Sequence, residues 1–259
     1  MGSDCTNPGL QYHRRVISDV SRFTLPSAFS GWWRSEFQQH GFLATLRKLR
    51  MALWDFVQES MPAERKRRYG DADFDWDARV DTTSATVGWR DRLIGCLYSA
   101  YQPTQPDEFR EMMLELPIRF EDFTFVDVGS GKGRVLLMAA DYPFRRILGI
   151  ELLPDLHQVA EGNIKKYKSS RQRCFTVEST CMDASRCQLP VEPLVIYLFH
   201  PLTEVALRQF MANLDASLAE HPRTIWVVYL NPILEYLLAQ SPHLRRTGGT
   251  HQFSIYANV

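Results

Sequence analysis

Apolar and polar positions follow a regular order from residue 123 to the end of the chain. Short apolar runs, which predict buried strands, alternate with stretches that carry an apolar residue every three or four positions, which predict helices. The strands are expected at 124–128, 146–152, 174–180, 193–199 and 224–230, and the helices at 132–141, 154–168, 203–219 and 232–240. This order is typical of βαβ units joined into a mainly parallel sheet.

Two last apolar runs, at 244–247 and 252–256, lie on either side of Gly248-Gly249 and predict a closing hairpin. With the five preceding strands the hairpin brings the total to seven. The fold expected from the pattern is therefore α/β: a seven-stranded, mostly parallel, Rossmann-like sheet with helices on both faces.

The first part of the chain, residues 1–97, is rich in aromatic residues and predicts helices and loops rather than strands. Apolar residues recur there at helical spacing and predict one amphipathic helix over about 36–60, whose apolar stripe should pack on its own domain. The stripe consists of Phe42, Leu43, Leu46, Leu49, Leu53, Trp54 and Val57.

A basic run at 64–70 is followed by alternating aspartates over 71–81. Because the opposite charges offset each other, the two runs predict a solvated loop. We therefore expect an N-terminal helical extension over 1–97, which forms a lid or acceptor region, and one catalytic domain over 98–259.

Composition narrows the class of protein. The 259 residues include 30 basic and 30 acidic residues, so no overall field attracts polyanions, and neither nucleic acid nor a membrane is expected as a partner. Five scattered cysteines form no CxxC pair, which argues against a metal site and for reduced thiols in the cytoplasm. The polar N-terminus and the lack of an apolar run of about 18 residues predict neither signal peptide nor spanning helix.

The strongest chemical signal is Asp127-Val128-Gly129-Ser130-Gly131-Lys132-Gly133, placed where a strand turns into a helix. Glycine suits such a turn because the backbone visits positive φ and approaches a ligand closely. Amides at the helix start can hold an anion, and the Asp127 carboxylate can accept from an ammonium group; a methionine moiety carries both groups. The dinucleotide pattern GxGxxG would need a third glycine where Arg134 stands. A tight turn without a ligand is the remaining alternative.

Two more acids follow strand ends. Glu151 ends the second strand, where a carboxylate can accept from ribose hydroxyls. Asp183 follows the third strand, where it could serve a ligand or cap a short helix. The carboxyl ends of parallel strands share one edge of the sheet, so the three acids are expected to lie together there.

Three glycines at alternate positions, with an acid two residues before the first, resemble the motif of class I S-adenosylmethionine (SAM)-dependent methyltransferases. Together with Tyr101-Gln102-Pro103-Thr104 and Tyr142-Pro143-Phe144, the chain over 98–259 resembles little-described bacterial members whose glycine loop is similar to that of the non-SET histone lysine methyltransferases. The resemblance implies SAM as cofactor and a tyrosine–proline loop that closes over it. The residues then expected to bind the cofactor are Tyr101, Thr104, Asp127, Gly129, Ser130, Gly131, Gly133, Glu151, Leu152, Asp183 and Ala184.

The end of the fourth strand departs from a common pattern. Enzymes that methylate nitrogen often carry Asn or Asp before two prolines here, whereas this chain has Phe199-His200-Pro201-Leu202. His200 is the candidate general base, because its pKa lies near neutrality, and Tyr101 is a second candidate catalytic residue; His200 could also merely cap the strand.

The expected function is in-line methyl transfer from SAM to a small-molecule acceptor, rather than to a protein. A protein lysine methyltransferase and a non-catalytic SAM-fold interaction module are the alternatives. The oligomeric state is not predicted.

Overall fold

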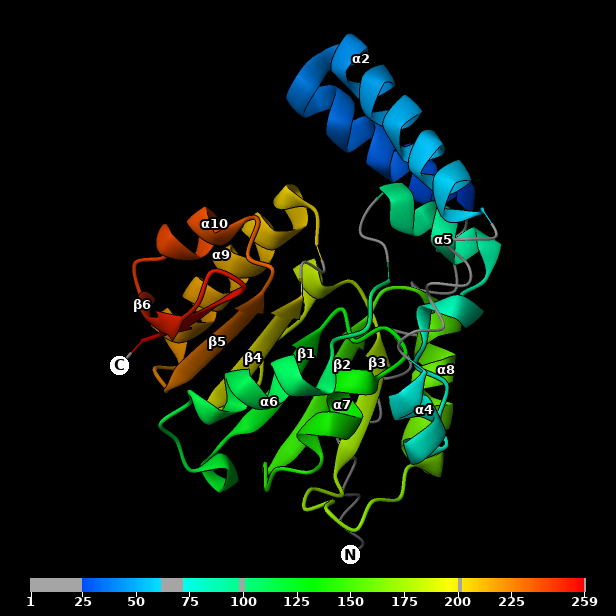
Figure 1. The fold of residues 1–259 in the computed structure, drawn as a ribbon. Coiled ribbons are helices and arrows are strands. Elements are labelled where there is room, and N and C mark those ends of the chain that lie inside the picture. Colours follow the sequence, from blue (N-terminus) through cyan, green and yellow to red (C-terminus); the bar gives the residue numbers. More distant parts are fainter. Residues whose placement is uncertain (1–24, 62–71, 98–100, 200–201, 259) are drawn as a thin grey trace, which may run out of the picture.

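The computed structural model describes residues 25–61, 72–97, 101–199 and 202–258 (Figure 1). Its centre is one seven-stranded sheet with the order β3-β2-β1-β4-β5-β7-β6. Neighbours among β1 to β5 pair in parallel, and β7 pairs antiparallel with both β5 and β6. The predicted seven-stranded, mostly parallel sheet is confirmed. The strands are β1 Thr124–Val128, β2 Arg146–Glu151, β3 Val177–Cys181, β4 Leu194–Phe199, β5 Ile225–Leu230, β6 Arg245–Gly249 and β7 Phe253–Ala257.

Two strand boundaries differ from the sequence-based expectation by more than one residue. The third strand begins at Val177 rather than at 174, because the amide of Cys174 donates to the carbonyl of Ala140 and not to the neighbouring strand. The closing hairpin turns after Gly249, where the amide of Thr250 donates to the carbonyl of Phe253, so both predicted turn glycines belong to β6.

Helices cover both faces of the sheet, as Figure 1 shows. One face carries α6 Pro106–Leu114, α7 Arg134–Ala139 and α8 Pro154–Lys166, and the other carries α9 Glu204–Glu220 and α10 Glu235–Ala239. Short 3-10 turns lie at Ser84–Thr86, Phe120–Asp122 and Ala184–Arg186. Successive strand residues alternate between the two faces: Phe125 packs with α6 and α7, whereas Val126 and Val128 pack on the α9 side.

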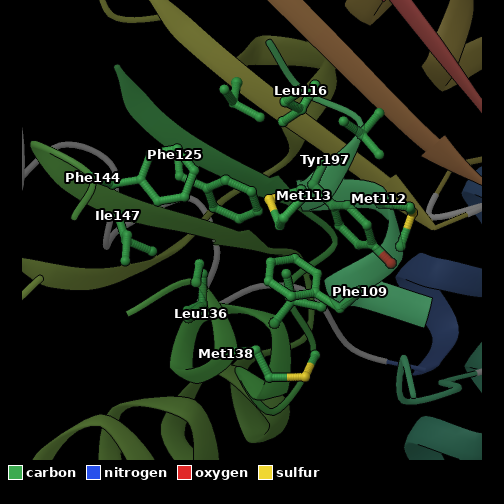
Figure 2. Close-up of a cluster of buried hydrophobic side chains, with 14 of the residues drawn as sticks. Phe109, Met112, Met113, Leu116, Phe125, Leu136, Met138, Phe144, Ile147 and Tyr197 are labelled. Carbon is green, nitrogen blue, oxygen red and sulfur yellow. The ribbon is translucent and has the colours of Figure 1, made fainter. Parts of the chain in front are cut away.

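The core on the α6 side combines packed aromatic rings with methionine and aliphatic side chains (Figure 2). Phe109 of α6 is 1% exposed, and its ring centroid lies 6.0 Å from that of Phe125 and 5.9 Å from that of Tyr197. Both contacts are edge-to-face, the arrangement that aromatic quadrupoles favour. Tyr197 therefore belongs to the same layer as Phe125, and this layer leads to the carboxyl end of β1.

The N-terminal helix differs from the prediction. α2 runs over Leu25–Glu59 and contains Gly41 with φ of 75° and ψ of 175°, so it consists of two helices joined at a sharp bend. It contacts α5, Trp89–Leu97, and projects beyond the sheet (Figure 1). Most of the predicted stripe is exposed, including Leu43 at 79% and Trp54 at 63%. The expectation that this stripe packs on the chain's own domain is wrong for the described residues. The buried cluster that involves α2 is small and consists of Trp32 and Ala52 of α2 with Leu97 of α5.

The predicted solvated loop of aspartates is also wrong where the structure describes it. Residues Asp73–Ala78 form the short helix α4, and Asp75 is buried at 9% exposure. The reason is a partner far away in the chain: Arg134 lies against the Asp75 carboxylate. The basic run at 64–70 lies outside the described residues. No helix in the described part is both long and apolar enough to cross a membrane.

Candidate active site

The candidate site lies at the carboxyl ends of β1 and β2, beside the place where the strand order reverses. β1 pairs with β2 on one side and with β4 on the other, so the chain leaves β1 next to a break in the sequential order. Crevices at this kind of position hold the ligands of open α/β sheets. The glycine loop that follows β1 therefore occupies the favoured place for a ligand.

The loop is fixed by its own backbone. Gly129, Gly131 and Gly133 have φ of 81°, 53° and 85°, a region that other residues avoid. The amides of Gly129 and Ser130 both donate to the carbonyl of Ile150 at the end of β2, at 2.8 and 3.0 Å. The loop is thus tied to the second strand before any ligand arrives.

Glu151 holds this arrangement from the end of β2. Its Oε2 accepts from the Gly131 amide at 2.7 Å and its Oε1 accepts from the Leu153 amide at 2.8 Å. Burial raises the pKa of Glu151, and the backbone hydrogen bonds oppose part of that rise. An ionised carboxylate has about four acceptor positions. Glu151 therefore braces the loop and still keeps acceptor capacity for hydroxyl groups.

Asp127 is in a different situation, although it lies close to Glu151. It is 3% exposed, and none of the described residues donates a hydrogen bond to its carboxylate. Burial, and then the nearby Glu151, raise its pKa well above 3.8. A buried carboxylate without a donor is costly. The site is thus chemically suited to a ligand that brings a cation or strong donors to Asp127.

Two further features fit a ligand that lies on this loop. The hydroxyl of Ser130 is buried and has no hydrogen-bond partner among the described residues. A Cβ added at Gly149 of β2 would lie 2.8 Å from that hydroxyl, so glycine is needed there for the loop to rest on the strand. The close packing of the loop on β2, and the carboxylate and hydroxyl groups that have no partner among the described residues, suit the ammonium and hydroxyl groups of an aminoacyl nucleoside such as SAM.

Tyr101 lies directly on the glycine loop. A Cβ built at Gly131 would approach its ring to 2.2 Å, so no larger residue fits at that glycine. The Tyr101 hydroxyl donates to the carbonyl of Thr82 at 2.7 Å. Thr104 is buried, with its hydroxyl 2.8 Å from that of Tyr197. Tyr197 pairs in register with Asp127, and its pKa is raised by burial and by Asp127.

The other expected residues are placed less centrally. Asp183 caps the 3-10 turn Ala184–Arg186, and its Oδ1 accepts from the amide and hydroxyl of Ser185 at 2.9 and 2.7 Å. Ala184 is buried and Leu152 is half-buried. Asp183 therefore has a structural task and one carboxylate oxygen left for a ligand. His200 lies outside the described residues.

Several residues beside the site were missed from the sequence. Tyr197 reads as one more apolar strand residue, and the sequence assigned no structural role to Lys132 or Arg134, yet both cations are 2% exposed. Asp91 of α5 was also missed; burial, and then Asp155, raise its pKa, and its charge in turn raises that of Glu151. One signal was available: Lys132 and Arg134 lie on either side of Gly133, within the turn that joins a buried strand to a helix.

Comparison with protein-family profiles and with curated proteins gives no match. Solved structures do match. A predicted N6-adenine-specific DNA methylase from Listeria monocytogenes is 14% identical with a TM-score of 0.45, over 61% of this chain and 51% of that one. An RNA methyltransferase from Salinibacter ruber, in complex with S-adenosyl-L-homocysteine, is 21% identical with a TM-score of 0.38, over 60% and 92%.

A precorrin-6y C5,15-methyltransferase from Geobacter metallireducens is 17% identical with a TM-score of 0.43, over 60% of this chain and 88% of that one. This chain spans about half the length of the Listeria protein. The likeness is one of fold: the chain has the Rossmann-like sheet found in SAM-dependent methyltransferases.

These comparisons correct one expectation. From the overall charge we expected a small-molecule acceptor and no nucleic acid as partner. That expectation is wrong, because solved structures of this fold include a predicted DNA methylase and an RNA methyltransferase. The physical reason is that a net charge of zero does not describe local surfaces. Residues 164–176, for example, contain five basic residues and no acidic one.

The raised pKa of the buried Asp127 carboxylate leads to a prediction about the stability of the ligand-free protein. Its folded-state pKa lies above its ordinary value of 3.8, so its contribution to stability is complete below that value and is lost as the pH rises through the folded-state pKa. Asp127→Asn should therefore raise the unfolding temperature of the ligand-free protein at about pH 8 by about 2–4 °C per kcal/mol recovered, and by less at about pH 5.

Thermal unfolding followed by circular dichroism measures this difference, with the exposed Glu121→Gln as control. An Asp127→Asn protein that is less stable than the original at about pH 8 would show that the carboxylate has a partner in the folded state.

Proposed function

We propose that this protein is a SAM-dependent methyltransferase. The observation that supports this most is the buried Asp127 carboxylate, which accepts no hydrogen bond from the described residues and lies close to Glu151 and to a glycine loop in positive-φ conformation. SAM carries an ammonium, a carboxylate and ribose hydroxyls, which are the groups this edge of the sheet is suited to bind.

In this proposal each group has a named partner. Asp127 accepts from the ammonium group, because a charge-assisted hydrogen bond offsets the cost of its burial. Amides in the first turn of α7 receive the carboxylate. Glu151 keeps its two backbone hydrogen bonds and accepts from the ribose with its remaining positions. Asp183 accepts from the adenine amino group with the oxygen not used by Ser185.

SAM supplies an activated methyl group on a positively charged sulfur, so the protein need not form a covalent intermediate. The work of the chain is to align the acceptor with that methyl group and to exclude water. Tyr101 and the half-buried residues around it provide the wall that excludes water on the side of the glycine loop. His200, which follows β4 in the sequence, is proposed to take a proton from an acceptor that starts protonated.

The extension over 1–97 and the domain over 98–259 are proposed to work as one catalytic unit. Asp91 of α5 lies close enough to Glu151 to raise its pKa, and the carbonyl of Thr82 accepts from the hydroxyl of Tyr101.

The class of acceptor is identified by incubating the protein and methyl-labelled SAM separately with RNA, DNA, protein and small-molecule fractions, and by measuring the label that each fraction takes up.

Cofactor binding tests the proposal. Calorimetric titration with SAM and with S-adenosylhomocysteine should give a dissociation constant in the micromolar range, with NADH as a control that does not bind. Glu151→Ala removes charge-assisted hydrogen bonds and should weaken binding about tenfold or more, whereas Glu121→Ala should leave it unchanged. Absence of binding to both adenosyl compounds would refute the function.

His200 has a separate test once an acceptor is found. His200→Ala should lower turnover by about a hundredfold or more, as expected for loss of a general base, while the affinity for SAM stays within about twofold of the original. Turnover at the original rate would rule out His200 as the base.

A further inference from the structure

Two buried cations beside the glycine loop have no place in the roles described above. Lys132 and Arg134 stand on either side of Gly133, and each is 2% exposed. Burying a charge is costly unless it is paired and hydrogen-bonded. Among the described residues, one short part of the N-terminal extension, residues 75–86, supplies hydrogen-bond partners to both cationic side chains.

Arg134 is bound to a compact acid and hydroxyl group. Its Nε donates to the Thr82 hydroxyl at 2.7 Å, and its Nη2 lies 3.3 Å from Oδ1 of Asp75. The Thr82 hydroxyl in turn donates to the same Oδ1. Asp75 Oδ2 accepts from the amides of Thr82 and Thr83, both at 2.6 Å. One carboxylate thus fixes both the cation and the backbone of the segment.

Lys132 fixes the same segment from the other side of Gly133. Its Nζ donates to Oδ1 of Asp81 at 3.0 Å, to the carbonyl of Thr83 at 2.9 Å, and to the hydroxyl of Thr86. Asn163 of α8 completes the attachment through its side-chain amide. Its Oδ1 accepts from the backbone amide of Asp81 at 2.9 Å, and its Nδ2 donates to the backbone carbonyl of Asp81 at 2.7 Å. We call residues 81–86, held in this way, the strap.

The strap reaches the candidate cofactor site through Tyr101. The Tyr101 hydroxyl donates to the carbonyl of Thr82 in the strap, and its ring lies on Gly131. The Lys132 ammonium lies 5.9 Å from the centre of that ring, within the range of a cation–π contact. The position of Tyr101 over the glycine loop is therefore coupled to the charges that hold the strap.

We propose that the strap is a wall of the SAM site, and that Asp75 acts with Arg134 and Lys132 as a positioning group that holds Tyr101 over the glycine loop. This inference rests on the proposed function. A wall that is ordered before binding reduces the entropy lost when the cofactor binds. Loss of the Asp75 charge should thus weaken the cofactor although Asp75 itself does not touch it.

Two substitutions test this. Asp75→Asn removes the charge that faces Arg134, and Tyr101→Phe keeps the ring but removes its hydrogen bond to the strap. Calorimetric titration with S-adenosylhomocysteine should show affinity lowered at least about tenfold for Asp75→Asn and about fivefold for Tyr101→Phe, as expected for a charged and a neutral hydrogen bond. Asp77→Asn, on the exposed side of the same helix, is the matched control and should bind as the original does.

Hydrogen exchange of the peptide that contains residues 79–87 separates a wall of the site from a merely structural attachment. Saturating S-adenosylhomocysteine should slow exchange of the Thr82 and Thr83 amides in the original protein, and should slow it less in Tyr101→Phe. Exchange that S-adenosylhomocysteine does not change would overturn the inference.

If Asp75→Asn fails to fold, Tyr101→Phe and the exchange measurement decide. Unchanged affinity in Tyr101→Phe, while the original protein binds S-adenosylhomocysteine, would overturn the strap's role and leave the proposed function intact. Lack of binding by the original protein would overturn both.

Discussion

The structure around the candidate site depends on two carboxylates buried side by side at the carboxyl ends of β1 and β2. Burial raises the pKa of both Asp127 and Glu151, and the charge of Glu151 raises the pKa of Asp127 further. Glu151 is stabilised by the amides of Gly131 and Leu153. Asp127 is not stabilised in this way. A fold that keeps such a carboxylate is less stable for it, and in the proposed function the ammonium group of SAM offsets this cost.

The remaining features follow from holding a backbone loop against that pair. The loop amides must point to β2 and Glu151, which requires positive φ at Gly129 and Gly131 and a residue without side chain at Gly149. The same tight turn brings Lys132 and Arg134 into the interior, where the N-terminal extension supplies their counter-charges. The N-terminal extension therefore helps to hold the glycine loop in place through these ion pairs.

Much of the sheet could be predicted because its signals are local. Five strands between helical stretches, and a hairpin at the end, follow from the periodicity of apolar residues alone, and the place of Asp127 and Glu151 follows from parallel pairing. Contacts between distant segments could not be predicted. Asp75 looked solvated because its partner Arg134 is far away in sequence, and Gly41 gave no sign that it bends α2. The net charge of zero likewise gave no sign of the locally basic segment at 164–176, and the expectation of a small-molecule acceptor without nucleic acid was wrong for that reason.

Binding of S-adenosylhomocysteine, compared with its analogue that lacks only the α-amino group, tests the central claim that Asp127 awaits an ammonium group. In the original protein the analogue should bind at least about tenfold more weakly, because a charge-assisted hydrogen bond is lost. In Asp127→Asn the two compounds should bind within about threefold of each other, since the charged partner is absent. Equal binding of both compounds by the original protein would contradict the account.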